Sequence, residues 1–176
     1  MARGNVSNTG LMMARLCYDL LMEKGRDALA AVERHEVTPA LEDVVEATIY
    51  LSGLGFENGG LAAAHAVNDG FAQEPQAHGM YHGEKVAFGT LVQLVLEKAP
   101  QEELEQVLAF LRDTGLPLTL AQLGVKEIVP ETLKKVAEAA VVPTQSTKNL
   151  RADITAQEVY DAILEADRIG RDYLAR

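Results

Sequence analysis

Several features that mark particular classes of protein are missing from this sequence of 176 residues. Its single cysteine, Cys17, excludes an intrachain disulfide and a cysteine-rich zinc module, and its apolar surroundings predict a buried structural thiol. No segment approaches the roughly 18 consecutive apolar residues of a membrane span. Residues 1–10 also lack the apolar core of a secretion signal. We therefore expect a cytoplasmic protein that does not cross a membrane.

Basic side chains are also scarce. Lys and Arg total 16 against 26 Asp and Glu, which gives a formal net charge of −10 at pH 7. A surface this acidic repels phosphate groups, so we expect neither nucleic acid nor an anionic membrane as a partner. Apolar residues make up 48% of the chain and charged residues 24%, which is typical of a globular protein with a sizeable core.

Apolar residues recur at helical spacing along nearly the whole chain, and no segment alternates as a β-strand would. Two helix starts are clear, because Thr38 precedes Pro39 and because Thr155 and Glu158 have the spacing of a capping box. A first helix is expected to start near residues 7–9, with a break or bend at Gly25. The class is therefore all-α, and with no repeat or linker we expect one domain over residues 1–176.

Three of the four histidines lie between residues 60 and 89. His65 ends an alanine run in one expected helix, and His82 lies near the start of the next, beyond a long loop. A helix–loop–helix hairpin can bring two such residues together, and imidazole suits Zn²⁺, Ni²⁺ or Fe²⁺. Each histidine can equally be an ordinary core or surface residue, so the residue pattern alone leaves both interpretations open.

Two other histidine patterns predict no metal site. His78 and His82 have the spacing of a helical ligand pair, but Gly79 and Gly83 argue against a continuous helix there. The stretch that begins at His35 resembles the start of the zinc-protease motif H-E-x-x-H, but Pro39 replaces the second histidine. Neither pattern therefore predicts a metal site.

Three stretches resemble one family closely: LSGLGFENGGLAAAHAVNDGF (51–71), YHGEKVAFGTLVQLVLE (81–97) and GLPLTLAQLG (115–124). They are similar to the C-terminal helical domain of the glycerol dehydrogenases, in the iron-containing (group III) alcohol dehydrogenase family. The resemblance extends from about Asn8 to the C-terminus. It implies a helical bundle that follows a nucleotide-binding domain, with the active site in the cleft between them.

The resemblance also implies a reaction and a set of site residues. These enzymes oxidise glycerol to dihydroxyacetone with NAD, using a divalent metal, usually zinc. Their metal is held by one aspartate and two histidines, and the histidines correspond to His65 and His82. Phe56 corresponds to an aromatic residue that lines the substrate pocket. The family's enzymes form homo-oligomers, so we expect self-association here as well.

The sequence departs from the family pattern at three points. It begins after the position of the metal-binding aspartate and after the nucleotide-binding domain, and Asn68 stands where many relatives have a further histidine. We therefore expect the metal-binding half of a glycerol dehydrogenase, inactive alone. The third ligand is left open among His78, Asp69, Glu57 and a neighbouring chain. The alternative is a non-catalytic helical interaction module derived from the same fold.

Overall fold

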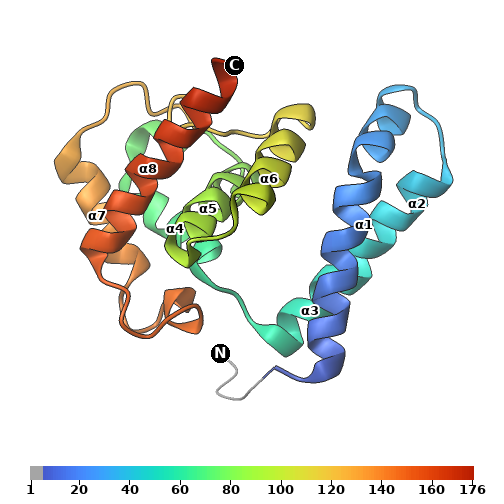
Figure 1. The fold of residues 1–176 in the computed structure, drawn as a ribbon, viewed down its shortest axis with the longest axis horizontal. Helices are drawn as coiled ribbons and strands as arrows, with labels where there is room; N and C mark the ends of the chain where they lie inside the picture. The colour runs from blue at the N-terminus through green and yellow to red at the C-terminus, as the bar shows by residue number, and fades with distance from the viewer. Residues whose placement is uncertain (1–5) are drawn as a thin grey trace. The chain divides into compact units, whose positions relative to one another are not determined.

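The computed structural model describes residues 6–176, and within that range it contains helices and turns but no strand. This confirms the all-α class. The chain divides into two compact units, Met1–Gly60 and Leu61–Arg176, whose elements are labelled in Figure 1. Each unit has its own cluster of buried apolar side chains. The expectation of one helical domain over residues 1–176 stays a prediction.

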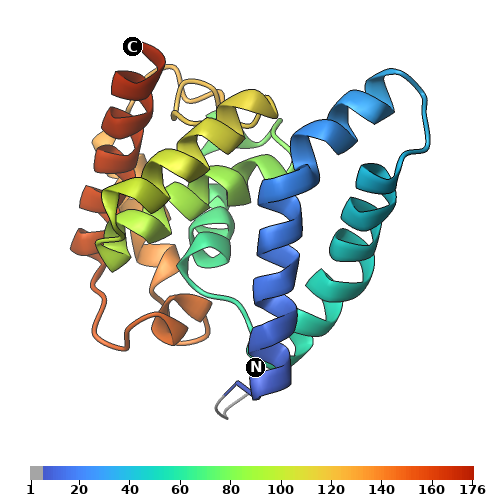
Figure 2. The ribbon, with the colours of Figure 1, turned by 45° about the vertical axis from the view of Figure 1, so that its right-hand side comes forward.

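The first unit contains α1 (Asn8–Glu33), α2 (Pro39–Glu46) and α3 (Ser52–Gly59), with a π-helical turn at Ala47–Leu51 between α2 and α3. Two of the expected caps are present. The Ser7 hydroxyl accepts the Gly10 N–H at 3.0 Å, and the Thr38 hydroxyl accepts the Leu41 N–H at 3.3 Å. The α1 helix is continuous through Gly25, where a break or bend was expected, and Figure 2 shows it curving rather than stopping.

The small core of this unit is built around Cys17, Ala47 and Leu51. The Cys17 thiol is buried and lies 3.4 Å from the carbonyl oxygen of Ala47, to which it donates a hydrogen bond. Burial raises the pKa of this thiol, because a thiolate is poorly solvated there. The prediction of a structural thiol is confirmed. The unit ends at Gly60, whose φ of 76° lies in the region that glycine adopts without strain.

The second unit contains α4 (Ala63–Gly70), α5 (His82–Glu97), α6 (Gln101–Asp113), α7 (Pro130–Ala140) and α8 (Ala156–Leu174). Helix α5 packs against α4, α6 and α8, and α7 packs against α4 and α8. The rings of Phe71 and Phe88 meet edge to face in the core, with centroids 6.1 Å apart. Burying side chains of this size stabilises a fold by about 1.5–3 kcal/mol each. The core therefore fixes α4 against α5.

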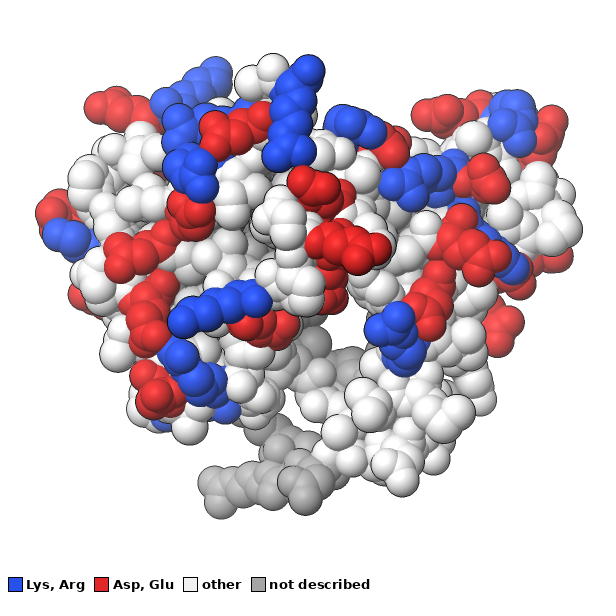
Figure 3. Space-filling view, viewed as in Figure 1, with Lys and Arg blue, Asp and Glu red and all other residues white. Residues whose placement is uncertain are grey.

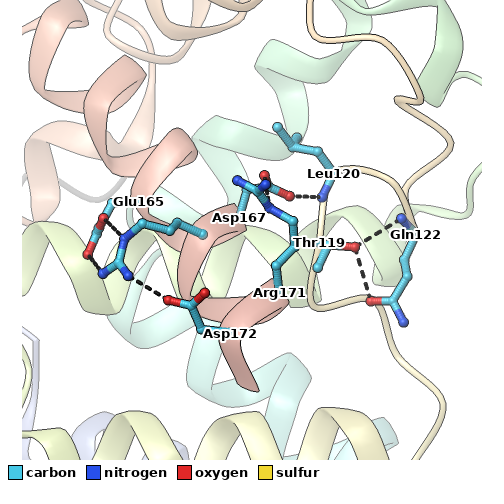
Figure 4. A network of polar contacts seen from close by, with 8 residues as sticks. Thr119, Leu120, Gln122, Glu165, Asp167, Arg171 and Asp172 are labelled. Atoms are coloured by element: carbon cyan, nitrogen blue, oxygen red, sulfur yellow. Dashed lines mark hydrogen bonds and ion pairs between the residues drawn. The ribbon is translucent and has the colours of Figure 1, made fainter. Parts of the chain in front are cut away.

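Residues 116–125 form a connector that leads from α6 to the segment before α7. This connector is hydrogen-bonded to α8 and packs against it. Asp167 is buried, and its Oδ1 accepts the Leu120 N–H at 2.9 Å (Figure 4). Its other oxygen lies 3.0 Å from Nε of Arg171. Gly170 lies on the same face of α8, where a β-carbon would be 2.0 Å from the Leu118 carbonyl oxygen. The connector therefore packs directly on the α8 backbone.

The last helix starts where the capping box predicts. Glu158 Oε2 accepts the Thr155 N–H at 2.8 Å, and the Thr155 hydroxyl accepts the Glu158 N–H at 3.2 Å. The backbone hydrogen bond from Thr155, together with Arg151, lowers the pKa of the Glu158 carboxyl below its ordinary value. The helix start predicted from this capping box is therefore confirmed.

Charged side chains of both signs are exposed on the described residues. On the face drawn in Figure 3, Lys and Arg are interspersed with Asp and Glu. Within residues 6–176, no helix has both the length and the apolar character needed to cross a membrane.

Candidate metal centre

The two histidines singled out from the sequence lie side by side in the second unit. His65 is in the first turn of α4, and His82 is the first residue of α5. Their ring centroids are 5.4 Å apart, and the ring planes are tilted by 50°. Two imidazoles that bind one tetrahedral ion through nitrogens at about 2.0–2.1 Å have centroids about 5 Å apart. The centroid separation of the pair is therefore close to the one that a shared ion requires.

Local hydrogen bonds fix where α5 begins, and with it the position of His82. Glu84 Oε2 accepts the Tyr81 N–H at 2.7 Å and so closes the first turn of the helix. Gly79 lies in the turn before α5, so His78 and His82 do not share a helix. The expectation that these two residues are not a helical ligand pair is confirmed.

The surroundings of His65 favour its neutral form. Partial burial lowers the pKa of this imidazole first, and the neighbouring His82 lowers it further, while Asp69 acts in the opposite direction. A neutral imidazole has a free nitrogen lone pair, which is the form that binds a metal. The surroundings of His65 therefore favour the form of the ring that is able to bind a metal.

Two of the possible third ligands, His78 and Asp69, make hydrogen bonds with other residues. His78 has its Nε2 3.0 Å from the Ala72 carbonyl oxygen. Asp69 accepts hydrogen bonds from Asn68 Nδ2 at 3.0 Å and from Gln145 Nε2 at 3.1 Å. Glu57 belongs to the other unit. Among the described residues, no set of three His, Cys, Asp or Glu side chains is grouped closely enough to hold a metal.

Polar side chains from a distant segment hold the start of α4, and the sequence analysis missed them. The Ser146 hydroxyl donates to the Ala62 carbonyl at 2.7 Å, and Asn149 Nδ2 donates to the Leu61 carbonyl at 2.7 Å. Both donors lie in the short 3₁₀ turn Ser146–Asn149. No local pattern points from this turn to residues more than 80 positions earlier.

Phe56 lies in α3 of the first unit, and 48% of its surface is exposed. Its assignment to a substrate pocket stays a prediction.

No family model matches the sequence. It is 54% identical over 174 residues to the glycerol dehydrogenase of Escherichia coli O6:H1, covering 99% of this chain and 47% of that relative. The fold superimposes on the crystal structure of glycerol dehydrogenase from Schizosaccharomyces pombe with a TM-score of 0.92 at 40% identity, covering 97% of this chain and 43% of that one. The crystal structure of a probable glycerol dehydrogenase from Sinorhizobium meliloti 1021 gives a TM-score of 0.91 at 43% identity, covering 96% of this chain and 48% of that one.

The described residues thus form an all-helical fold that matches part of the structures of proteins named glycerol dehydrogenases. More narrowly, the chain resembles the C-terminal helical part of the glycerol dehydrogenases in sequence and in fold, which confirms the resemblance seen in the sequence. The chain spans about half the length of the curated relatives that it matches.

Proposed function

We propose that this chain supplies the metal-binding helical part of an NAD-dependent dehydrogenase that oxidises glycerol, or a related polyol, to the corresponding ketone. The observation that carries the proposal is the His65–His82 pair, whose 5.4 Å centroid distance is close to the one that a shared tetrahedral ion requires. Relatives called glycerol dehydrogenases support the polyol substrate. Zinc as the metal, NAD as the hydride acceptor and the cytoplasm as the location are parts of the same proposal.

Each residue has a defined part in this proposal. His65 and His82 hold the ion, which when bound supplies Lewis-acid stabilisation of negative charge on the alcohol oxygen. The packed core behind α4 and α5, with Phe71 and Phe88 fully buried, keeps the two rings at a fixed separation. Substrate binding by Phe56 is part of the same proposal.

The 176-residue polypeptide alone is expected to show no NAD-dependent glycerol oxidation. Dinucleotides bind at the carboxyl ends of parallel strands, and residues 6–176 form no strand. Without a site that orients the cofactor, about 7–11 kcal/mol of barrier reduction is lost. The measurement is glycerol-dependent NADH formation by the purified polypeptide, and a clear rate would contradict this part of the proposal.

A fusion protein tests whether activity appears once a nucleotide-binding half is supplied. The N-terminal half of the E. coli relative joined to this chain is expected to oxidise glycerol with NAD. The matched fusion that carries His82→Ala is expected to be inactive while it folds equally well. A folded fusion without activity, or one indifferent to His82→Ala, would contradict the proposed function.

The alternative function, a helical interaction module, is favoured by one observation. Large apolar side chains are exposed on the first unit, with Met12 72%, Ile49 75% and Tyr50 61% accessible. Exposed apolar residues in such numbers mark surfaces that other proteins cover. Such a surface is able to bind either a second copy of this chain or a different protein.

Self-association is therefore expected at micromolar concentration, as a dimer or larger species in sedimentation velocity. Ile49→Lys is expected to shift the chain toward the monomer, because it places a charge on the exposed apolar residues. Val37→Lys is the matched control, since Val37 is 80% exposed but lies in the turn between α1 and α2. A wild-type chain that sediments only as a monomer would contradict the expectation.

A further inference from the structure

Helix α4, which carries His65, begins without a cap of its own. Its N-cap residue is Ala62, which has no side chain able to accept a hydrogen bond. The N–H groups of a first helical turn have no partner within the helix and need one elsewhere. The Ala64 N–H finds its partner on α5, where Gln93 Oε1 accepts it at 3.0 Å. Ala64, whose N–H is bound in this way, directly precedes His65 in the chain.

Gln93 and His82 share one face of α5. His82, Gly89 and Gln93 are separated by seven and four residues, which at 3.6 residues per turn places all three on the same side of the helix. A β-carbon at Gly89 would lie 2.4 Å from the Ala64 carbonyl oxygen, so the two helices meet there at backbone distance. The face of α5 that carries one histidine thus contacts the residue that precedes the other.

The amide of Gln93 is itself oriented by a neighbour. Its Nε2 donates to Glu97 Oε1 at 2.8 Å, one turn further along α5. Because the amino group is engaged there, the carbonyl oxygen faces Ala64. The acceptor for the first turn of α4 is therefore fixed in place by a second hydrogen bond.

From these contacts we propose that Gln93 is a positioning residue for the metal pair: its amide oxygen fixes the first turn of α4, and through it the place of His65 relative to His82. The inference deepens the proposed function and rests on it. Outer residues that hold metal ligands in place typically contribute 10–100-fold to metal affinity. Gln93 acts on the backbone beside the ligand rather than on the imidazole.

The test is a calorimetric Zn²⁺ titration of metal-stripped protein. Gln93→Met has a similar length but no strong acceptor, and is expected to weaken zinc binding about tenfold. Gln93→Glu keeps an oxygen for the Ala64 N–H and places a negative charge near a helix N-terminus, but it loses the donor to Glu97 and repels that carboxylate. It is therefore expected to bind zinc more tightly than Gln93→Met and more weakly than the wild type. Gln93→Lys, which also lacks an acceptor, replaces the Met variant if that variant does not fold.

Gln101→Met is the matched control. Gln101 also donates its amide to a glutamate four residues on, Glu105, at 3.1 Å, but it is an exposed residue at the start of α6. The visible absorption spectrum of bound Co²⁺ provides a second readout, because it follows ligand geometry. The spectrum is expected to change with Gln93→Met, to change less with Gln93→Glu, and to be unchanged with Gln101→Met.

The possible outcomes separate this inference from the proposed function. A wild-type chain that binds no zinc overturns the metal site and the role of Gln93 together. Wild-type binding that is equally tight in folded Gln93→Met, with the same Co²⁺ spectrum, overturns the role of Gln93 alone. An equal loss in Gln101→Met also overturns it, since the effect would not then depend on α4. Weakening in Gln93→Met with partial recovery in Gln93→Glu supports it.

Discussion

Gly170→Ala is expected to lower the free energy of unfolding of the larger unit by about 2 kcal/mol, although alanine is the better helix former by about 1 kcal/mol. The added β-carbon would lie 2.0 Å from the Leu118 carbonyl oxygen and 3.2 Å from Thr119 Cγ2. Backbone cannot rotate away as a flexible side chain can, so α8 and the connector must separate. That movement would also stretch the hydrogen bond from Leu120 to Asp167, which contributes about 1 kcal/mol.

Gly83→Ala is the matched control for this substitution. Gly83 lies in α5 of the same unit, and a β-carbon there has nothing within 4 Å. We expect its free energy of unfolding to be unchanged or slightly raised, because it adds a methyl group to a helix without a clash. Urea unfolding followed by circular dichroism gives both values. Equal stability of the two variants would show that α8 does not pack on the connector as described.

The features that the sequence predicted correctly are those that depend on neighbours in the chain. Thr38 and Thr155 were identified as caps because a capping side chain bonds to backbone two or three residues on. At Gly25 the expected break does not occur and α1 continues, because a glycine within a helix costs only about 1 kcal/mol.

The features that the sequence did not predict depend on contacts between distant segments. Asp167, Ser146 and Gln93 resemble ordinary polar residues in their local sequence, yet each bonds to backbone between 29 and 84 positions away. Nothing in the spacing of residues encodes such partners. The hairpin of helices allowed His65 and His82 to meet, but only the family resemblance predicted them as a metal pair. The third ligand depends on side-chain placement.

Removing either histidine is expected to weaken zinc binding by more than about 100-fold, which exceeds the 10–100-fold typical of outer positioning partners. His65→Ala and His82→Ala each leave only one of the two imidazoles, so the ion is no longer held by two protein ligands at once. His78→Ala is the control, because the His78 ring is exposed and lies beside the Ala72 carbonyl oxygen instead of the pair. We expect this variant to bind zinc as the wild type does. A loss equal to that of His82→Ala would make His78 the third ligand.

The central claim, that His65 and His82 form a working metal site in this chain, is tested most directly by calorimetric zinc titration of the metal-stripped protein. We predict one zinc ion per chain, with binding abolished by His82→Ala and by His65→Ala and retained by His78→Ala. No zinc binding by the wild-type chain, or binding that neither substitution changes, would contradict the claim and favour the interaction module.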